Sequence, residues 1–87
     1  MPGTDRGELL RTVTEVLVEV LPDGLPGGWA PDRPLVEAGL DSVAMLELVA
    51  ALESRFRIRF APGDMDATNF GTLGALVELV ERRSSGR

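Results

Sequence analysis

Asp41 and Ser42 are the residues whose types and spacing best suit chemistry, because they stand directly before an apolar stretch of helical periodicity. They follow Gly39, a residue type that readily adopts the positive φ of a tight helix entry. Either side chain can cap the helix, although Ala44 and Met45 occupy the positions where a capping box needs Glu or Gln. A serine hydroxyl there can also be modified, since a helix N-terminus stabilises an attached phosphodiester.

The composition argues against catalysis by the chain itself. It contains no His, Cys, Tyr or Lys, so the usual proton shuttles and activated nucleophiles are missing. The carboxylates are scattered rather than paired in one motif. We therefore predict no catalytic residue and no enzyme. Modification of Ser42 would need a base and a metal from a separate transferase.

The charge balance points to protein partners. Fourteen acidic residues against nine basic ones give a net charge of −5, which disfavours nucleic acid and favours basic protein surfaces. No apolar run is long enough to cross a bilayer, and Asp5, Glu8, Glu15 and Glu19 exclude the apolar core of a signal peptide. The chain has no cysteine and therefore no disulfide bonds, which is consistent with a reducing compartment. We expect a cytoplasmic monomer without membrane partners.

The periodicity predicts an all-α fold, a small helical bundle in a single domain over 1–87. The expected elements are a helix over about 5–21 capped by Thr4 or Asp5, a long first loop over 22–41, a helix over about 42–56, a short helix over about 65–70, a helix over about 72–83 and a tail over 84–87. The apolar positions of the first and last helices are Leu9, Leu10, Val13, Val16, Leu17, Val20 and Leu21, and Leu73, Leu76, Val77 and Val80.

The segments between the helices need apolar anchors. The long loop is rich in proline and glycine, and its candidate anchors are Trp29, Leu35, Val36 and Leu40. After the second helix, arginines alternate with apolar residues in a stretch that has no partner strand. We predict an extended connector there, with Phe56, Ile58 and Phe60 facing the core.

The helix over 42–56 has two distinct faces. One stripe is assigned to the core and consists of Met45, Leu48, Val49, Leu52 and Phe56. The other face carries Val43, Leu46, Glu47, Ala50, Glu53 and Ser54, and its mixture of apolar and acidic residues suggests a small docking surface. For Leu46 the pattern fits burial as well as exposure, whereas Val43 and Ala50 are expected to face outward.

The segment that starts at Asp64 matches only the beginning of the calcium-loop pattern. Asp64, Asp66 and Thr68 have suitable spacing, but Asn69 replaces the required glycine and Ala75 the bidentate glutamate. We predict no metal site and expect Asp64 to cap the short helix instead.

The stretch Leu35-Val-Glu-Ala-Gly-Leu-Asp-Ser-Val-Ala-Met-Leu-Glu-Leu-Val-Ala-Ala-Leu-Glu-Ser-Arg-Phe56 resembles the signature of acyl carrier proteins, and the likeness extends to about Val80. The resemblance implies that Ser42 receives 4′-phosphopantetheine from coenzyme A through a Mg²⁺-dependent phosphopantetheinyl transferase. Asp41 matches the acid that helps to position the transferase's metal. The thiol of the arm would hold acyl or aminoacyl groups as thioesters.

The resemblance also implies partners. Val43, Leu46, Glu47, Ala50 and Glu53 match the helix that meets basic enzyme surfaces. The partners would be the transferase, a loading enzyme (a ligase, adenylation enzyme or acyltransferase) and a downstream synthase, transferase or thioesterase.

Departures from the family pattern suggest a specialised pathway. Ala44, Ser54 and Arg55 stand where carriers of fatty acid synthesis commonly have acids, and Val43 replaces the usual leucine. This favours polyketide, lipopeptide or other secondary metabolism. Alternatives are a stand-alone peptidyl or aminoacyl carrier, although the turn lacks the Gly-Gly-x-Ser typical of peptidyl carriers, and a protein adaptor whose serine is never modified.

Overall fold

The computed structural model describes residues 5–85. Three main helices, α1 (Arg6–Val20), α2 (Ser42–Phe56) and α4 (Leu73–Ser85), are joined by loops that contain the short helix α3 (Ala67–Phe70) and two 3₁₀ turns, η1 (Leu35–Ala38) and η2 (Pro62–Asp64). Within residues 5–85 no strand forms, and the only β-like pairing is a single bridge between Pro34 and Thr72. The predicted all-α bundle with one short helix and a long first loop is confirmed.

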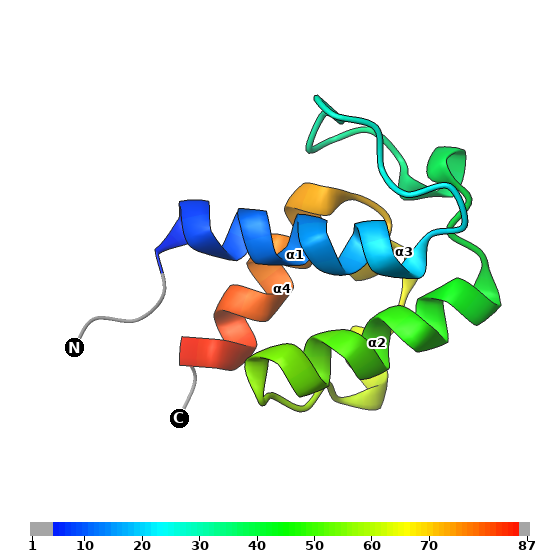
Figure 1. Cartoon of the computed structure of the whole chain (residues 1–87). Coiled ribbons are helices and arrows are strands. Elements are labelled where there is room, and N and C mark those ends of the chain that lie inside the picture. The colour runs from blue at the N-terminus through cyan, green and yellow to red at the C-terminus, as the bar shows by residue number, and fades with distance from the viewer. Residues whose placement is uncertain (1–4, 86–87) are drawn as a thin grey trace.

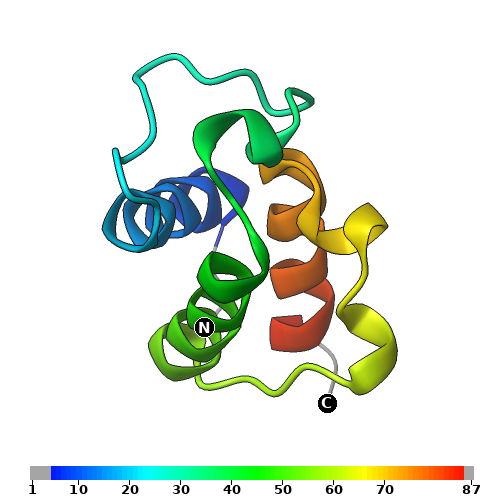
Figure 2. The ribbon, with the colours of Figure 1, turned by 90° about the vertical axis from the view of Figure 1, so that its right-hand side faces the viewer.

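Helix α4 lies at the centre of the arrangement. It contacts α1 and α2 on one side and the short helix α3 on the other. Figure 1 shows α1 lying across α4, with α2 below, and Figure 2 shows the first loop passing over the end of the bundle where α2 begins. None of the helices within residues 5–85 is long and apolar enough to span a membrane.

The helix ends follow from local chemistry. The Asp5 carboxylate caps α1 by accepting a hydrogen bond from the Glu8 N–H, whereas Thr4, the other predicted cap, lies outside the described residues. Arg57, with φ of 57°, ends α2 in the left-handed conformation. The Thr72 hydroxyl accepts a hydrogen bond from the Ala75 N–H and so caps α4. The main helices thus lie within about two residues of their predicted limits.

The predicted tail over 84–87 differs from the structure. Ser84 and Ser85 belong to the last turn of α4, and positions 86–87 lie outside the described residues.

Three interior assignments also differ from the prediction. Leu10 is 39% exposed, because it lies at the edge of the buried stripe of α1 on the side where Val18 is also exposed. Val36 is 69% exposed, so it does not anchor the loop. Leu79 was not expected in the core but is fully buried, since α4 is covered on two sides rather than one.

The connector after α2 has the predicted extended form. Phe56 and Ile58 are half-buried and Phe60 is buried. The Phe60 ring meets Phe70 edge to face, with 5.6 Å between the ring centroids. This contact joins the connector to α3.

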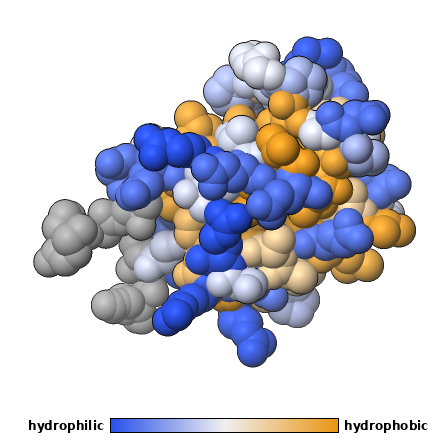
Figure 3. Space-filling model, in the orientation of Figure 1, coloured by the Kyte–Doolittle hydropathy of each residue, from blue (hydrophilic) through white to orange (hydrophobic). Residues whose placement is uncertain are grey.

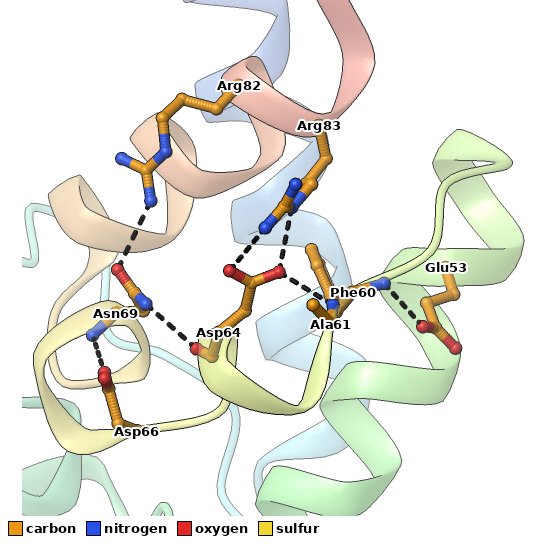
Figure 4. A network of polar contacts seen from close by, with 8 residues as sticks. All are labelled: Glu53, Phe60, Ala61, Asp64, Asp66, Asn69, Arg82 and Arg83. Atoms are coloured by element: carbon orange, nitrogen blue, oxygen red, sulfur yellow. Dashed lines mark hydrogen bonds and ion pairs between the residues drawn. The ribbon is translucent and has the colours of Figure 1, made fainter. Parts of the chain in front are cut away.

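Asp64 does not cap α3, contrary to the prediction. Asp66 is the cap, and its carboxylate accepts a hydrogen bond from the Asn69 N–H at 2.8 Å. The buried Asp64 instead accepts two hydrogen bonds from Arg83 of α4, at 2.6 and 2.8 Å, and one from the Ala61 N–H (Figure 4). The bonds from Arg83 and then from Ala61 lower the pKa of Asp64, and the same ion pair raises the pKa of Arg83.

Candidate functional site

Ser42 is the first residue of α2 and is exposed. The preceding residue, Asp41, is the N-cap, and its Oδ1 accepts a hydrogen bond from the Ala44 N–H at 2.8 Å. Within residues 5–85 the Ser42 hydroxyl makes no hydrogen bond. Because Asp41 alone caps the helix, Ser42 is not needed for capping and its oxygen is available to solvent.

A short 3₁₀ turn places Ser42 at this position. Leu35 is fully buried, and its N–H donates a hydrogen bond to the Gly71 carbonyl at 2.8 Å, which fixes η1 against the start of α4. Gly39 then ends η1 with φ of 98°, as the sequence predicted. Leu40 packs against the core, so the chain turns sharply before Asp41 and Ser42.

The rest of the long loop is held by Trp29 and its neighbours. Trp29 is half-buried and packs against the core, as expected for an anchor. The Arg33 guanidinium lies 4.1 Å from the centre of the indole ring and forms an ion pair with Glu37 at 2.8 Å. These contacts connect the middle of the loop to η1.

A pocket of about 370 Å³ opens directly beside Ser42. Its lining is mostly apolar and comes from the loop, α2 and the end of α3: Pro34, Val36, Leu40, Asp41, Ser42, Met45, Phe70 and Gly71. Sequence reasoning assigned Met45 to the core and Val36 to the loop anchors, so it missed both as parts of this site. The pairing of Leu35 with Gly71, which brings η1 next to Gly71 in the lining of the pocket, has no local sequence signal.

Four of the five predicted partner-binding residues are exposed on one face of α2. Val43 is 66% and Leu46 69% exposed, and Glu47 and Ala50 are exposed beside them. Leu46, for which the sequence fitted burial and exposure equally well, is therefore exposed. Figure 3 shows hydrophobic residues reaching the right-hand surface, where α2 begins.

The fifth residue, Glu53, is differently placed. It is half-buried, and its Oε2 accepts a hydrogen bond from the Phe60 N–H at 2.9 Å (Figure 4). Its carboxylate therefore stabilises the connector after α2 and is only partly directed to solvent.

Among the described residues, no group of three or more His, Cys, Asp or Glu side chains is arranged to hold a metal ion. The arrangement around Ser42 presents an accessible hydroxyl at the positive end of a helix, next to one carboxylate and an apolar pocket. Such a site can receive and display a group attached by another protein.

Comparison with known proteins agrees with this geometry. The model of the phosphopantetheine attachment site family matches residues 11–80, which include the turn, Ser42 and all of α2. The chain belongs to this family. It is thus a phosphopantetheine-binding carrier protein, of a family whose members hold phosphopantetheine covalently.

The curated relatives of this carrier are much longer proteins. It is 48% identical over 48 residues to phthioceranic/hydroxyphthioceranic acid synthases of Mycobacterium tuberculosis and Mycobacterium bovis. The match covers 55% of the carrier but spans only 2% of each synthase.

A solved structure shares the fold of the carrier. It is a complex of Bradyrhizobium japonicum glycine:[carrier protein] ligase with glycylated carrier protein. The matched chain superposes with a TM-score of 0.70 at 24% identity, covering 83% of the present chain and 96% of the matched one.

Proposed function

We propose that Ser42 is the attachment point of 4′-phosphopantetheine and that the chain carries acyl or aminoacyl intermediates between enzymes. The observation that carries this proposal is the exposed Ser42 hydroxyl, which no other group in the described chain engages. It lies within the part of the chain that the family model matches. When bound, the arm would supply a terminal thiol that holds the cargo as a thioester.

The surroundings of Ser42 fit a phosphodiester. The backbone N–H groups of Ser42 and Val43 make no hydrogen bond within residues 5–85, so they can donate to phosphate oxygens. The apolar walls of the neighbouring pocket, formed by Val36, Leu40 and Met45, offer a surface for the less polar part of the arm.

Attachment would be carried out by a phosphopantetheinyl transferase. Ser42 Oγ would bond to the phosphorus of the phosphopantetheine part of coenzyme A, the pyrophosphate link would break, and adenosine bisphosphate would leave. Asp41 would help to position Mg²⁺ in that complex, because its carboxylate lies next to the reacting hydroxyl and only Oδ1 is used in capping. The transferase would supply the base that accepts the Ser42 proton, since the chain has no histidine or lysine.

The remaining partners would be enzymes that load, extend and release the cargo. The synthase relatives support a role in making polyketide or other specialised acyl products, and the glycylated carrier in the solved complex makes an aminoacyl cargo the second candidate. The loading enzyme would be a ligase, adenylation enzyme or acyltransferase, followed by a synthase, transferase or thioesterase. We place this work in the cytoplasm, with the carrier as a monomer.

Intact-mass measurement tests the proposal. The purified apo chain is incubated with coenzyme A, Mg²⁺ and a broad-specificity transferase, and a mass gain of one phosphopantetheine is expected. Ser42→Ala should abolish the gain. Ser84→Ala is the matched control, because Ser84 is also exposed but lies in the last turn of α4, and it should be modified like the wild type. If the wild type gained no mass, an adaptor with an unmodified serine would be favoured instead.

A further inference from the structure

The outward face of α2 is a continuous strip from the serine end to the far end of the helix. We call it the outer strip, and it consists of Val43, Leu46, Glu47, Ala50, Ser54 and Arg57. All six residues are exposed. The first five lie on one side of α2, because residues three, four or seven positions apart share a helix face, and Arg57 is the left-handed C-cap that follows them. The outer strip starts beside Ser42, so a protein that reaches Ser42 can also contact it.

α2 has two acidic residues, and only one of them belongs to the outer strip. Glu53 is half-buried and accepts a hydrogen bond from the Phe60 N–H, so its carboxylate is held toward the connector. Glu47 is exposed and forms no ion pair within the described chain. It is therefore the single acidic residue of the outer strip itself.

The outer strip ends at Arg57, and a second arginine, Arg59, follows two residues later, so this end of α2 is basic. Arg57 and Arg59 are exposed, and neither forms an ion pair with any of the described residues. Arg55 differs, because it pairs with Glu15 at 3.4 Å and Glu19 at 3.5 Å and so joins α2 to α1. Two arginines are thus left to interact with another molecule.

Arg57 and Arg59 border a hollow of about 550 Å³. Its other lining residues are Ala50, Glu53, Ser54 and Ile58. The left-handed conformation of Arg57 turns the chain at the end of α2, and Arg59 then lies along the same hollow. The helix dipole favours Arg55, in the last turn of α2, and Arg57, at its C-cap, but it does not explain Arg59, which lies two residues beyond the cap. The hollow therefore has a mixed polar and apolar lining, in which the two arginines outnumber the one half-buried acid, Glu53.

We propose that the outer strip docks on a partner enzyme that presents carboxylates to Arg57 and Arg59. Because α2 has 15 residues, these carboxylates would lie about 22 Å from the place where the partner surface faces Ser42 itself. The middle of the contact is apolar, through Leu46 and Ala50. This partner chemistry is opposite to the uniformly basic surface that the resemblance implied for this helix, and it rests on the proposed carrier function.

The test measures how fast the holo chain is loaded by its own enzyme. That enzyme is purified from the natural host by its ability to form a thioester on the holo chain. Arg57→Glu and Arg59→Glu are compared with Arg11→Glu, which makes the same charge change at an exposed position on α1 that has no ion pair in the described residues. Circular dichroism and thermal unfolding verify that each variant folds.

Arg57→Glu and Arg59→Glu should each raise KM by about three- to tenfold with kcat nearly unchanged, because charges at the rim of an interface act mainly on association. The increase should shrink at high salt, and Arg11→Glu should behave like the wild type. Equal KM values for all three variants, tighter binding after charge reversal, or an effect confined to kcat would each overturn the proposal. Failure to form any holo chain would instead contradict the attachment at Ser42, so the two failures are distinguishable.

Discussion

At the scale of single residues, the site divides two tasks between neighbours. Asp41 caps α2 by accepting a hydrogen bond from the Ala44 N–H, which leaves the Ser42 hydroxyl without a structural role in the described chain. If the Ser42 hydroxyl itself capped the helix, attachment of a group to its oxygen would disturb the capping hydrogen bond. The division lets Ser42 gain a group without loss of the helix start.

Substitution of Asp41 should separate its two roles. Asp41→Asn keeps an amide oxygen for the cap, so the free energy of unfolding should change by less than about 0.5 kcal/mol. Asp41→Ala removes the cap and should lower it by about 1 kcal/mol. Both variants lose the carboxylate that we assign to the transferase's metal, so the initial rate of phosphopantetheinylation should fall about tenfold or more in each.

Urea unfolding and a timed mass assay measure these quantities. If Asp41→Asn were modified at the wild-type rate, Asp41 would be only a cap and its assigned role toward the metal would be wrong.

At the scale of elements, the position of Ser42 depends on the turn between η1 and α2. Gly39 adopts φ of 98°, and Leu35 holds η1 to the start of α4 through the Gly71 carbonyl. A side chain at position 39 would meet Pro22 at 3.6 Å, an ordinary contact distance, so the obstacle there is backbone conformation rather than space.

Gly39→Ala should therefore destabilise the fold by about 1–2 kcal/mol, the cost of a left-handed conformation for a residue with a Cβ. Gly27→Ala is the control, because Gly27 has no positive φ and a Cβ added there would meet no atom within 4 Å beyond its chain neighbours. Chemical denaturation of both variants measures the difference. Equal stabilities would show that the turn can relax without cost.

The elements were predictable where a local pattern specifies them. The three main helices follow from their apolar periodicity, and Asp41, Gly39 and Pro22 indicate where the first loop ends and begins. The role of Asp64 was not predictable, because its partner Arg83 is 19 positions away and no local rule couples them. Local chemistry therefore identified a possible cap, whereas tertiary contacts gave that role to Asp66.

At the scale of the whole molecule, burial depends on which helix is central. Leu79 is buried because α4 is covered by α1 and α3, and Leu10 is partly exposed because one side of α1 is left uncovered. Periodicity identifies a buried stripe but not its width, which depends on the neighbours of each helix. For the same reason the sequence predicted Ser42 and its helix but not the pocket beside them.

The ion pair between Asp64 and Arg83 connects η2 to the last helix and should make stability depend on pH. Because these contacts lower the folded-state pKa of Asp64 below its unfolded value of about 3.9, the pair stabilises the fold fully above that pH. This stability should be lost as the pH falls through the folded-state pKa. Asp64→Asn should be less stable at neutral pH and should lose less stability on acidification.

Thermal unfolding between neutral and acidic pH measures this effect. Asp32→Asn, a change at an exposed aspartate without a hydrogen bond in the described chain, should follow the wild-type curve. If Asp64→Asn lost as much stability on acidification as the wild type, the Asp64–Arg83 ion pair would not be the cause of the pH dependence.

The central claim is that one oxygen, Ser42 Oγ, bears the prosthetic group. The most direct measurement is fragmentation mass spectrometry of the chain after production together with a phosphopantetheinyl transferase. We predict that the added phosphopantetheine is located on Ser42 and on no other hydroxyl of the chain. An added group on Ser54 or on a threonine, or a chain that remains unmodified, would contradict this claim.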